Sequence, residues 1–391
     1  MQENSRFAST RHLLELCVGY YLSYVLTGIA VKVFTGGIRE PRMSDMAFLF
    51  NNTIGGNGLA LGAVIAMGWL TLKGARTIRL GGLNLPAETA YIIPSGICTA
   101  IIIPGTTLLY TLPISVMVAM VIMRASVIVI SRAVDAIQIR QGLLKRQVLP
   151  EENWAVVFAL LALGTNLMLI PLVDMLDARG VPVSQTFGMK PGALSGGFEF
   201  IHSPLAMTVL IAYIIAYAVR LYIMNYFKNT RGPGQTLDNR GFFAIEQVAA
   251  TAGILFMGVL VYVGRDAFGW SAPAVIAFHQ AAGRLDLAAI LSGIPFGLVA
   301  FFSVFLFMFQ GRTATFAGVV NRLTSLLAGT TATLLLAWIW KQRPPSIQDW
   351  ASLGFILIAV GFLTRAERRR SAEATKKAPA PAGVAKPVIT G

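Results

Sequence analysis

Two arginines are the first candidates for chemistry, because each interrupts a long apolar segment. These residues are Arg124 and Arg322. A charge at the centre of a bilayer costs at least ~2.5–3.5 kcal/mol, so an ionisable residue there indicates a functional site by default. The guanidinium group stays charged at physiological pH, and its planar fork fits a phosphate or a carboxylate. The two arginines could therefore bind an anionic group. Ion pairing with Glu15 or Glu246, or hydrogen bonding to freed backbone carbonyls, is the structural alternative.

Other polar residues of the apolar segments could assist these arginines. Asn321 is adjacent to one of them, and Tyr24 and Tyr217 could line the same cavity. Interhelical hydrogen bonding and ordinary packing are the simpler explanations for these three residues. Glu246 could bind a coupling proton or pair with an arginine, and Arg220 could extend its charge to the membrane surface or form an ion pair. We favour the ion pair, because a lone buried charge costs more than a paired one.

The residues that most catalytic and metal sites require are scarce. The chain has three His and two Cys, and none of them shows metal-ligand spacing. No P-loop, nucleophile elbow or pair of catalytic carboxylates occurs. We therefore predict no catalytic residue, no metal and no cofactor. Without a nucleotide site, energy for any transport would come from a gradient or from exchange.

The composition indicates which elements hold these residues. Of the 391 residues, 55% are hydrophobic and 13% are charged, and the mean hydropathy is +0.67. A soluble protein this apolar could not cover its own surface, so an all-α integral membrane protein is expected. Transmembrane helices need about 20 apolar residues. The chain offers ten such spans: 12–35, 53–72, 87–107, 110–132, 153–173, 204–227, 241–264, 288–310, 314–338 and 347–364.

The basic residues predict the orientation of these spans. The net charge is +14, which could suggest nucleic-acid binding. The Lys and Arg residues instead concentrate in alternate loops and in the C-terminal tail, roughly 20 against 8. Cytoplasmic loops carry this excess, so both termini are expected in the cytoplasm. We predict a multi-pass protein of the bacterial inner membrane with no nucleic-acid partner, and a first helix that is retained.

An internal repeat divides the spans into five and five. Residues 94–97 read Pro-Ser-Gly-Ile and residues 291–294 read Leu-Ser-Gly-Ile. The segment around Arg124 likewise matches the segment around Arg322. Two repeats with an odd number of spans must cross the membrane in opposite senses, as in many secondary transporters. The predicted parts are an N-terminal tail (1–11), a first five-helix repeat (12–173), an extracytoplasmic loop (174–203), a second repeat (204–364) and a basic, disordered tail (365–391).

The end of the chain resembles a known superfamily. Residues 321–329 (Asn-Arg-Leu-Thr-Ser-Leu-Leu-Ala-Gly) are followed by a second apolar run in 345–354 and 356–363. This pattern is similar to the last two helices of drug/metabolite transporter superfamily proteins, the EamA-like, nucleotide-sugar and sugar-phosphate transporters. The resemblance implies ten helices in two inverted five-helix repeats. It also implies secondary transport of a small organic solute.

Three functions fit these observations. The first is alternating-access transport of an anionic metabolite, phosphorylated or similar to a sugar nucleotide, or of a lipid-linked headgroup. The second is a membrane-embedded enzyme that acts on a lipid, and the third is a membrane assembly subunit without transport. The expected partners are the lipid bilayer and a small anionic substrate, and a homodimer is compatible with the sequence. Two arginines facing one cavity would favour transport.

Overall fold

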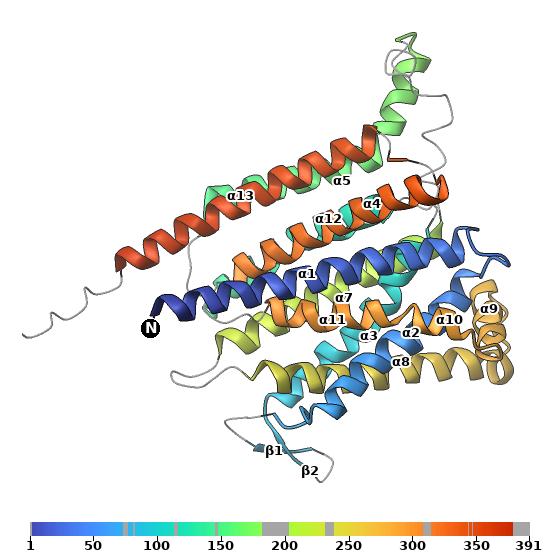
Figure 1. The fold of residues 1–391 in the computed structure, drawn as a ribbon, viewed down its shortest axis with the longest axis horizontal. Coiled ribbons are helices and arrows are strands. Elements are labelled where there is room, and N and C mark those ends of the chain that lie inside the picture. The colour runs from blue at the N-terminus through green and yellow to red at the C-terminus, as the bar shows by residue number, and fades with distance from the viewer. Residues whose placement is uncertain are drawn as a thin grey trace, which may run out of the picture.

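The protein is a bundle of long helices with one short β-hairpin at its edge (Figure 1). Its structure is a computed structural model. The residues that it describes are 2–72, 77–80, 83–112, 116–144, 148–181, 203–230, 238–307, 314–342, 344–345 and 347–377.

The helices of the N-terminal half are α1 (Gln2–Thr35), α2 (Asp45–Ala66), α3 (Thr89–Thr111), α4 (Val116–Arg140) and α5 (Pro150–Ala178). The antiparallel strands β1 (Thr77–Leu80) and β2 (Leu83–Pro86) form the hairpin between α2 and α3. The helices of the C-terminal half are α7 (Pro204–Asn229), α8 (Asn239–Phe268), α9 (Pro273–Ala282), α10 (Leu287–Leu291), α11 (Ile294–Phe307), α12 (Ala314–Trp340) and α13 (Ile347–Lys377).

Local sequence explains where several helices begin. Ser44, Ser203, Asp238 and Asp286 stand directly before α2, α7, α8 and α10. Each side chain accepts a hydrogen bond from the backbone amide three residues further on, which satisfies one of the unpaired amides of the first turn. Gly269 ends α8 in the left-handed conformation, which glycine adopts without a steric penalty.

Eight of the described helical segments are long and apolar enough to cross a membrane, which agrees with an all-α membrane protein. They are Leu13–Thr35, Thr89–Thr111, Val116–Arg140, Ala206–Asn229, Asn239–Phe268, Leu287–Leu306, Asn321–Trp340 and Asp349–Arg370. The expected spans 53–72 and 153–173 fall on the helices α2 and α5, which are not among these eight.

Several boundaries differ from the sequence prediction. Helix α2 begins at Asp45 and ends at Ala66, so it lies earlier than the span 53–72. The span 288–310 is interrupted, because α10 ends at Leu291 and α11 begins at Ile294. The N-terminal tail 1–11 is helical from Gln2, as part of α1. Of the predicted loop 174–203, the first residues belong to α5, and 182–202 lie outside the described residues.

The prediction of disorder from residue 365 was wrong for the stretch up to Lys377. Helix α13 continues through this stretch without interruption. Its residue Arg370 forms a 2.7 Å ion pair with Glu152 on α5, and Arg369 lies 3.2 Å from Glu151. A polar stretch that cannot bury apolar surface by itself is therefore held against a neighbouring helix. Residues 378–391 lie outside the described part of the chain.

The outer surface of the bundle is apolar along the helices. On α1, Leu14, Val18, Leu22 and Leu26 recur every four residues and are 48–60% exposed. A continuous apolar stripe of this kind faces lipid and not water. Tryptophan favours the membrane–water interface. All six tryptophans lie at or just beyond a helix end: Trp69, Trp154, Trp270, Trp338, Trp340 and Trp350.

The helices of the two halves can be matched by their order in the chain: α1 with α7, α2 with α8, α3 with α10 and α11, α4 with α12, and α5 with α13. Similar contacts then occur in both halves. Helix α1 packs on α11 and α12, and its counterpart α7 packs on α3 and α4. Helix α2 packs on α10 and α11, and its counterpart α8 packs on α3. Three further contacts join counterparts directly: α4 with α12, α5 with α13, and α2 with α8. In Figure 1, α5 and α13 lie side by side along one edge of the bundle.

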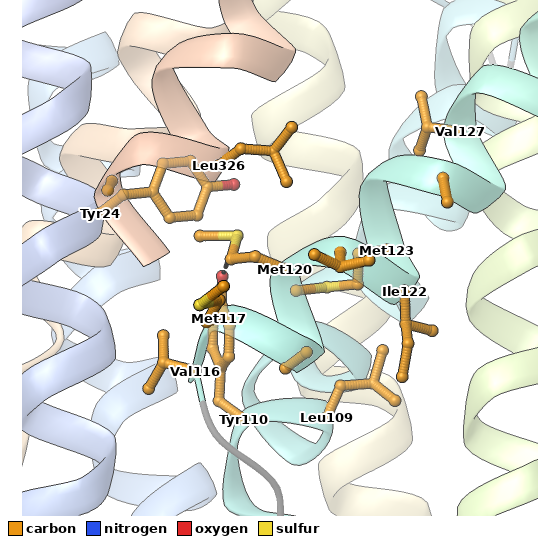
Figure 2. Packing of buried hydrophobic residues seen from close by; sticks show 14 of the residues in the cluster. Tyr24, Leu109, Tyr110, Val116, Met117, Met120, Ile122, Met123, Val127 and Leu326 are labelled. Atoms are coloured by element: carbon orange, nitrogen blue, oxygen red, sulfur yellow. Dashed lines mark hydrogen bonds between the residues drawn. The ribbon is translucent and has the colours of Figure 1, made fainter. Parts of the chain in front are cut away.

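Helix α4 lies at the centre of the packing. Its residues from Val116 to Ile128 are all buried, so no side of this stretch faces lipid or water. Figure 2 shows Met117, Met120 and Met123 of this helix surrounded by side chains from α1, α3 and α12. A charged residue in this stretch is therefore enclosed by protein.

Candidate functional site

Arg124 lies in the fully buried stretch of α4 and is 3% exposed. Its Nη2 donates to the hydroxyl of Tyr24 at 2.7 Å, and the Tyr20 hydroxyl lies 3.5 Å from the same nitrogen. The guanidinium carbon also stands 5.3 Å from the centre of the Tyr24 ring. The buried Nε–H has no hydrogen-bond partner. One end of this side chain is thus held by tyrosines, while a donor at its other end is unused.

Arg322 occupies the corresponding position on α12 and is 7% exposed. Its Nη2 donates to the Ser131 hydroxyl on α4 at 2.8 Å. Its buried Nε–H, like that of Arg124, has no hydrogen-bond partner. Arg322 is close enough to Arg124 for the two positive charges to repel each other. Arg124 and Arg322 therefore belong to one group of buried residues. We call these two arginines and the side chains around them the arginine cluster.

The acidic residues do not neutralise this cluster. Arg220 on α7 forms an ion pair with Glu246 on α8, through Nε and Nη2 at 2.8 Å each. Glu15 lies on α1 with an exposed side chain. Within the described part of the chain, Arg124 and Arg322 make no ion pair with a carboxylate. The pairing with Glu15 or Glu246 that the sequence left open is therefore not found for either arginine.

Glu246 is fully occupied as an acceptor. Its Oε1 also accepts from the Ser95 hydroxyl at 2.6 Å and from Thr99 at 3.3 Å, both on α3. The side chain is 2% exposed. A carboxylate with a bidentate arginine and two hydroxyl donors is satisfied in its charged form. This geometry serves to hold α3, α7 and α8 together and does not resemble a site for a mobile proton.

Five tyrosines surround Arg124, and all are at most 7% exposed. They come from three helices: Tyr20 and Tyr24 from α1, Tyr110 from α3, and Tyr213 and Tyr217 from α7. The Tyr110 hydroxyl points toward Met120 and donates to its sulfur at 3.0 Å (Figure 2). Among the described residues, nothing hydrogen-bonds the hydroxyls of Tyr213 and Tyr217.

Asn321 connects the cluster to the second half of the bundle. It is completely buried and directly precedes Arg322 on α12. Its Oδ1 accepts from the Tyr20 hydroxyl at 3.1 Å, and its Nδ2 lies 3.4 Å from the Ser303 hydroxyl on α11. The amide thus serves interhelical bonding, as the simpler explanation proposed, and does so next to both arginines.

The arginine cluster has an excess of positive charge and of hydrogen-bond donors. Two positive charges are buried together, and each arginine has an N–H donor without a hydrogen-bond partner. A guanidinium group has donors and no acceptors. A buried charge without a partner is costly, so an anion that supplied acceptors would stabilise this arrangement. The cluster therefore has the donors and the positive charge to bind a small anion.

The structure brings most of the predicted site residues together and separates the others. Arg124, Arg322, Asn321, Tyr24 and Tyr217 lie in the cluster. The predicted charge-pairing residues Arg220 and Glu246 pair with each other, and Glu15 lies on the exposed side of α1.

Sequence reasoning missed Tyr110 and Ser131. A tyrosine or serine in an apolar helix is usually an ordinary packing residue, and only the rotation of each helix reveals which of them face an arginine.

No group of three or more His, Cys, Asp or Glu residues that could hold a metal ion occurs in the described residues. The sequence was also compared with known proteins. No family model matches the chain, and no curated protein matches its sequence. The arguments for a function therefore rest on the cluster and on the arrangement of the helices.

Proposed function

We propose that this protein is a multi-pass secondary transporter that moves a small organic anion by alternating access. The observation that carries the proposal is the pair of buried arginines, Arg124 and Arg322. Each has an N–H donor without a hydrogen-bond partner, and neither pairs with a carboxylate of the described residues. Their substrate would be an anionic metabolite, phosphorylated or similar to a sugar nucleotide, or a lipid-linked headgroup. Such a group would supply the negative charge that the cluster lacks.

The helix crossings support two related halves. Gly96 on α3 lies against the backbone of α8 at Glu246 and Ala250. Gly293, its counterpart in the repeated Ser-Gly-Ile sequence, lies against the backbone of α2 at Asn52 and Gly56. Only glycine allows backbones to approach this closely. The repeated sequence thus makes the same kind of crossing in each half.

The serines beside these glycines support the same relation. Ser95 donates to Glu246 on α8, and Ser292 lies 3.4 Å from the Asn52 amide on α2. With the exchanged helix contacts, these crossings favour ten helices in two inverted five-helix repeats. Substrate sites of such transporters lie between the repeats, near the middle of the membrane. The arginine cluster lies where the counterparts α4 and α12 meet.

The remaining parts of the proposal follow the distribution of charge. Basic loops and the basic tail would face the cytoplasm, with both termini on that side of the bacterial inner membrane. Membership of the drug/metabolite transporter superfamily is part of the proposal and rests on the resemblance of residues 321–363.

Thermal unfolding of the purified protein in detergent tests the substrate site. The panel contains inorganic phosphate, glycerol 3-phosphate, UDP-glucose and neutral sugars. An anion that binds the native state stabilises it by ~2.7 kcal/mol at 100 times its Kd. We expect Arg124→Gln and Arg322→Gln to abolish this stabilisation. The matched control Arg369→Gln removes an exposed arginine. The anion should stabilise this variant as much as it stabilises the parent chain.

Two results would overturn the proposal. One is the absence of stabilisation by every anion in the panel. The other is stabilisation that survives in both folded arginine variants, which would make these arginines structural. Uptake of the stabilising anion into proteoliposomes then distinguishes transport from binding alone, because an assembly subunit or an enzyme would not accumulate it.

A further inference from the structure

We infer that Tyr20 is a positioning residue, whose hydroxyl ties Arg124 of the first half to Asn321 of the second half. The inference rests on the proposed function and concerns the geometry of the same site. Tyr20 is completely buried on α1. Its hydroxyl is the one group among the described residues that lies within hydrogen-bonding distance of both side chains.

The direction of the hydrogen bonds follows from the chemistry of the groups. The Oδ1 atom of Asn321 can only accept, so the Tyr20 hydroxyl donates its single proton to it, at 3.1 Å. The lone pairs of the hydroxyl are then left for Arg124, whose Nη2 lies 3.5 Å away. The same Nη2 donates to Tyr24 at 2.7 Å. The proton on Tyr20 is therefore committed to Asn321, and the oxygen faces the guanidinium.

The ring of Tyr20 is fixed independently of its hydroxyl. It packs edge-on against the Tyr24 ring, with 4.8 Å between centroids and 85° between planes. A phenylalanine at this position would keep these ring contacts and remove only the oxygen. The contribution of the hydroxyl can therefore be measured without opening a cavity.

The second half of the chain provides a comparison for this connection. Tyr213 and Tyr217 on α7 have the same four-residue spacing as Tyr20 and Tyr24 on α1. In the sequence repeat, the residue that corresponds to Asn321 is Met123, which offers no amide oxygen. Among the described residues, nothing hydrogen-bonds the Tyr213 hydroxyl. In the part of the chain that the structure describes, a connection of this kind therefore occurs in one half only, and we expect it to restrict the motion of the Arg124 side chain.

The expected effect of Tyr20→Phe is on the fit of the anion. Arg124 would lose one of the two oxygens near its Nη2, and Asn321 would lose the donor to its carbonyl. The guanidinium would then sample orientations that do not suit the substrate. We expect the KM for the anion to rise roughly 3- to 10-fold while the maximal rate changes by less than about 2-fold, which corresponds to a loss of uniform binding.

The experiment uses the full chain in proteoliposomes, with phosphate, glycerol 3-phosphate or UDP-glucose as the transported probe. The matched control is Tyr21→Phe. Tyr21 is the next residue on α1, and its hydroxyl lies 2.7 Å from the Thr331 hydroxyl on α12. Tyr21→Phe breaks a hydrogen bond between the same two helices, away from the arginines. A purely structural role for Tyr20 would give both variants the same KM and the same melting temperature.

The variant Asn321→Ala tests the connection from its other end. If Tyr20 acts through Asn321, the double variant should have about the same KM as the worse single variant, because the effects of coupled residues do not add. Effects on KM that multiply, or a Tyr20→Phe variant that matches Tyr21→Phe, would overturn the inference and leave the proposed function standing. If none of the three probes binds the parent chain, the proposed function fails, and this inference fails with it.

Discussion

The guanidinium group of Arg220 donates to both carboxylate oxygens of Glu246, at 2.8 Å each. This bidentate pair lies at the contact of α7, α8 and α3, where two hydroxyls complete the shell of the carboxylate. The one fully buried carboxylate of α8 is therefore committed to Arg220. Among the described residues, Arg124 and Arg322 donate only to tyrosine and serine hydroxyls, and this division of charges leaves the cluster with an excess of positive charge.

Removing Glu246 alone should destabilise the protein strongly. Glu246→Ala leaves Arg220 buried without its counter-charge, and breaking a buried ion pair in this way costs ~3–5 kcal/mol. Thermal or denaturant unfolding in detergent measures the loss. The double variant Arg220→Met with Glu246→Met should recover much of it, because no charge is then left unpaired. Arg369→Ala breaks exposed pairs and should cost less than ~1 kcal/mol. Equal losses for Glu246→Ala and Arg369→Ala would show that the buried pair contributes little.

Glycine-to-alanine substitutions should distinguish the glycines that allow two helices to pack closely from those that have no neighbour. A Cβ at Gly96 would lie 2.6 Å from the Glu246 carbonyl oxygen, so Gly96→Ala should cost ~1–3 kcal/mol through overpacking. A Cβ at Gly58 or Gly62, both within helix α2, would meet no atom within 4 Å. Alanine at those two positions should stabilise by ~0.5–1 kcal/mol, since glycine is the poorer helix former. Unfolding free energies of the three variants check this. A Gly96→Ala variant as stable as the parent would mean that α3 and α8 can move apart freely.

The ion pair at the start of α10 should make stability depend on pH. The backbone amide of Ala289, followed by the guanidinium of Arg39, lowers the pKa of Asp286. A carboxyl whose pKa is lower when folded stabilises the protein above its unfolded pKa of about 3.9. This stabilisation disappears as the pH falls through the folded pKa. Asp286→Ala should therefore cost ~1 kcal/mol near pH 7, and the difference from the parent should vanish at more acidic pH.

Melting temperatures of the parent and of Asp286→Ala, measured between pH 7 and pH 3, test this dependence. Asp286→Asn is the control, because the amide oxygen can still cap the helix but does not titrate. A difference between parent and Asp286→Ala that stays constant over this range would assign the effect to packing and not to charge.

Cysteine labelling should reveal the orientation of α8. Thr230 directly follows α7, before the connection to α8, and Ser271 lies just after α8; both are exposed. In a chain whose Cys17 and Cys98 are replaced by alanine, a membrane-impermeant maleimide should label Ser271→Cys in intact bacterial cells. Thr230→Cys should react only after the cells are permeabilised, because the positive-inside rule places it in the cytoplasm. The opposite result would reverse the topology. Labelling of both sites from one side would mean that α8 does not cross the membrane.

The sequence alone determined the class of the protein and the identity of its unusual charges. Hydropathy over about 20 residues is a local property, so the apolar segments and the arginines inside them are visible without tertiary contacts. Because hydropathy is averaged over a local window, it also placed some helix boundaries at the wrong residues. Within 288–310 the average stayed apolar across the interruption at Ser292 and Gly293. The continuation of α13 to Lys377 depends instead on Glu151 and Glu152 of a distant helix.

Only the tertiary structure decided which polar groups are partners. The sequence left open which arginine pairs with Glu246, and the packing of α7 against α8 selects Arg220. The close approaches at Gly96 and Gly293 fix how the helices cross. Those crossings bring Tyr20 to Asn321, about 300 positions apart in the chain. Such pairings depend on distances between helices, which cannot be derived from any local segment of the sequence. For this reason, the buried arginines could be predicted from the sequence, and their lack of a counter-charge could not.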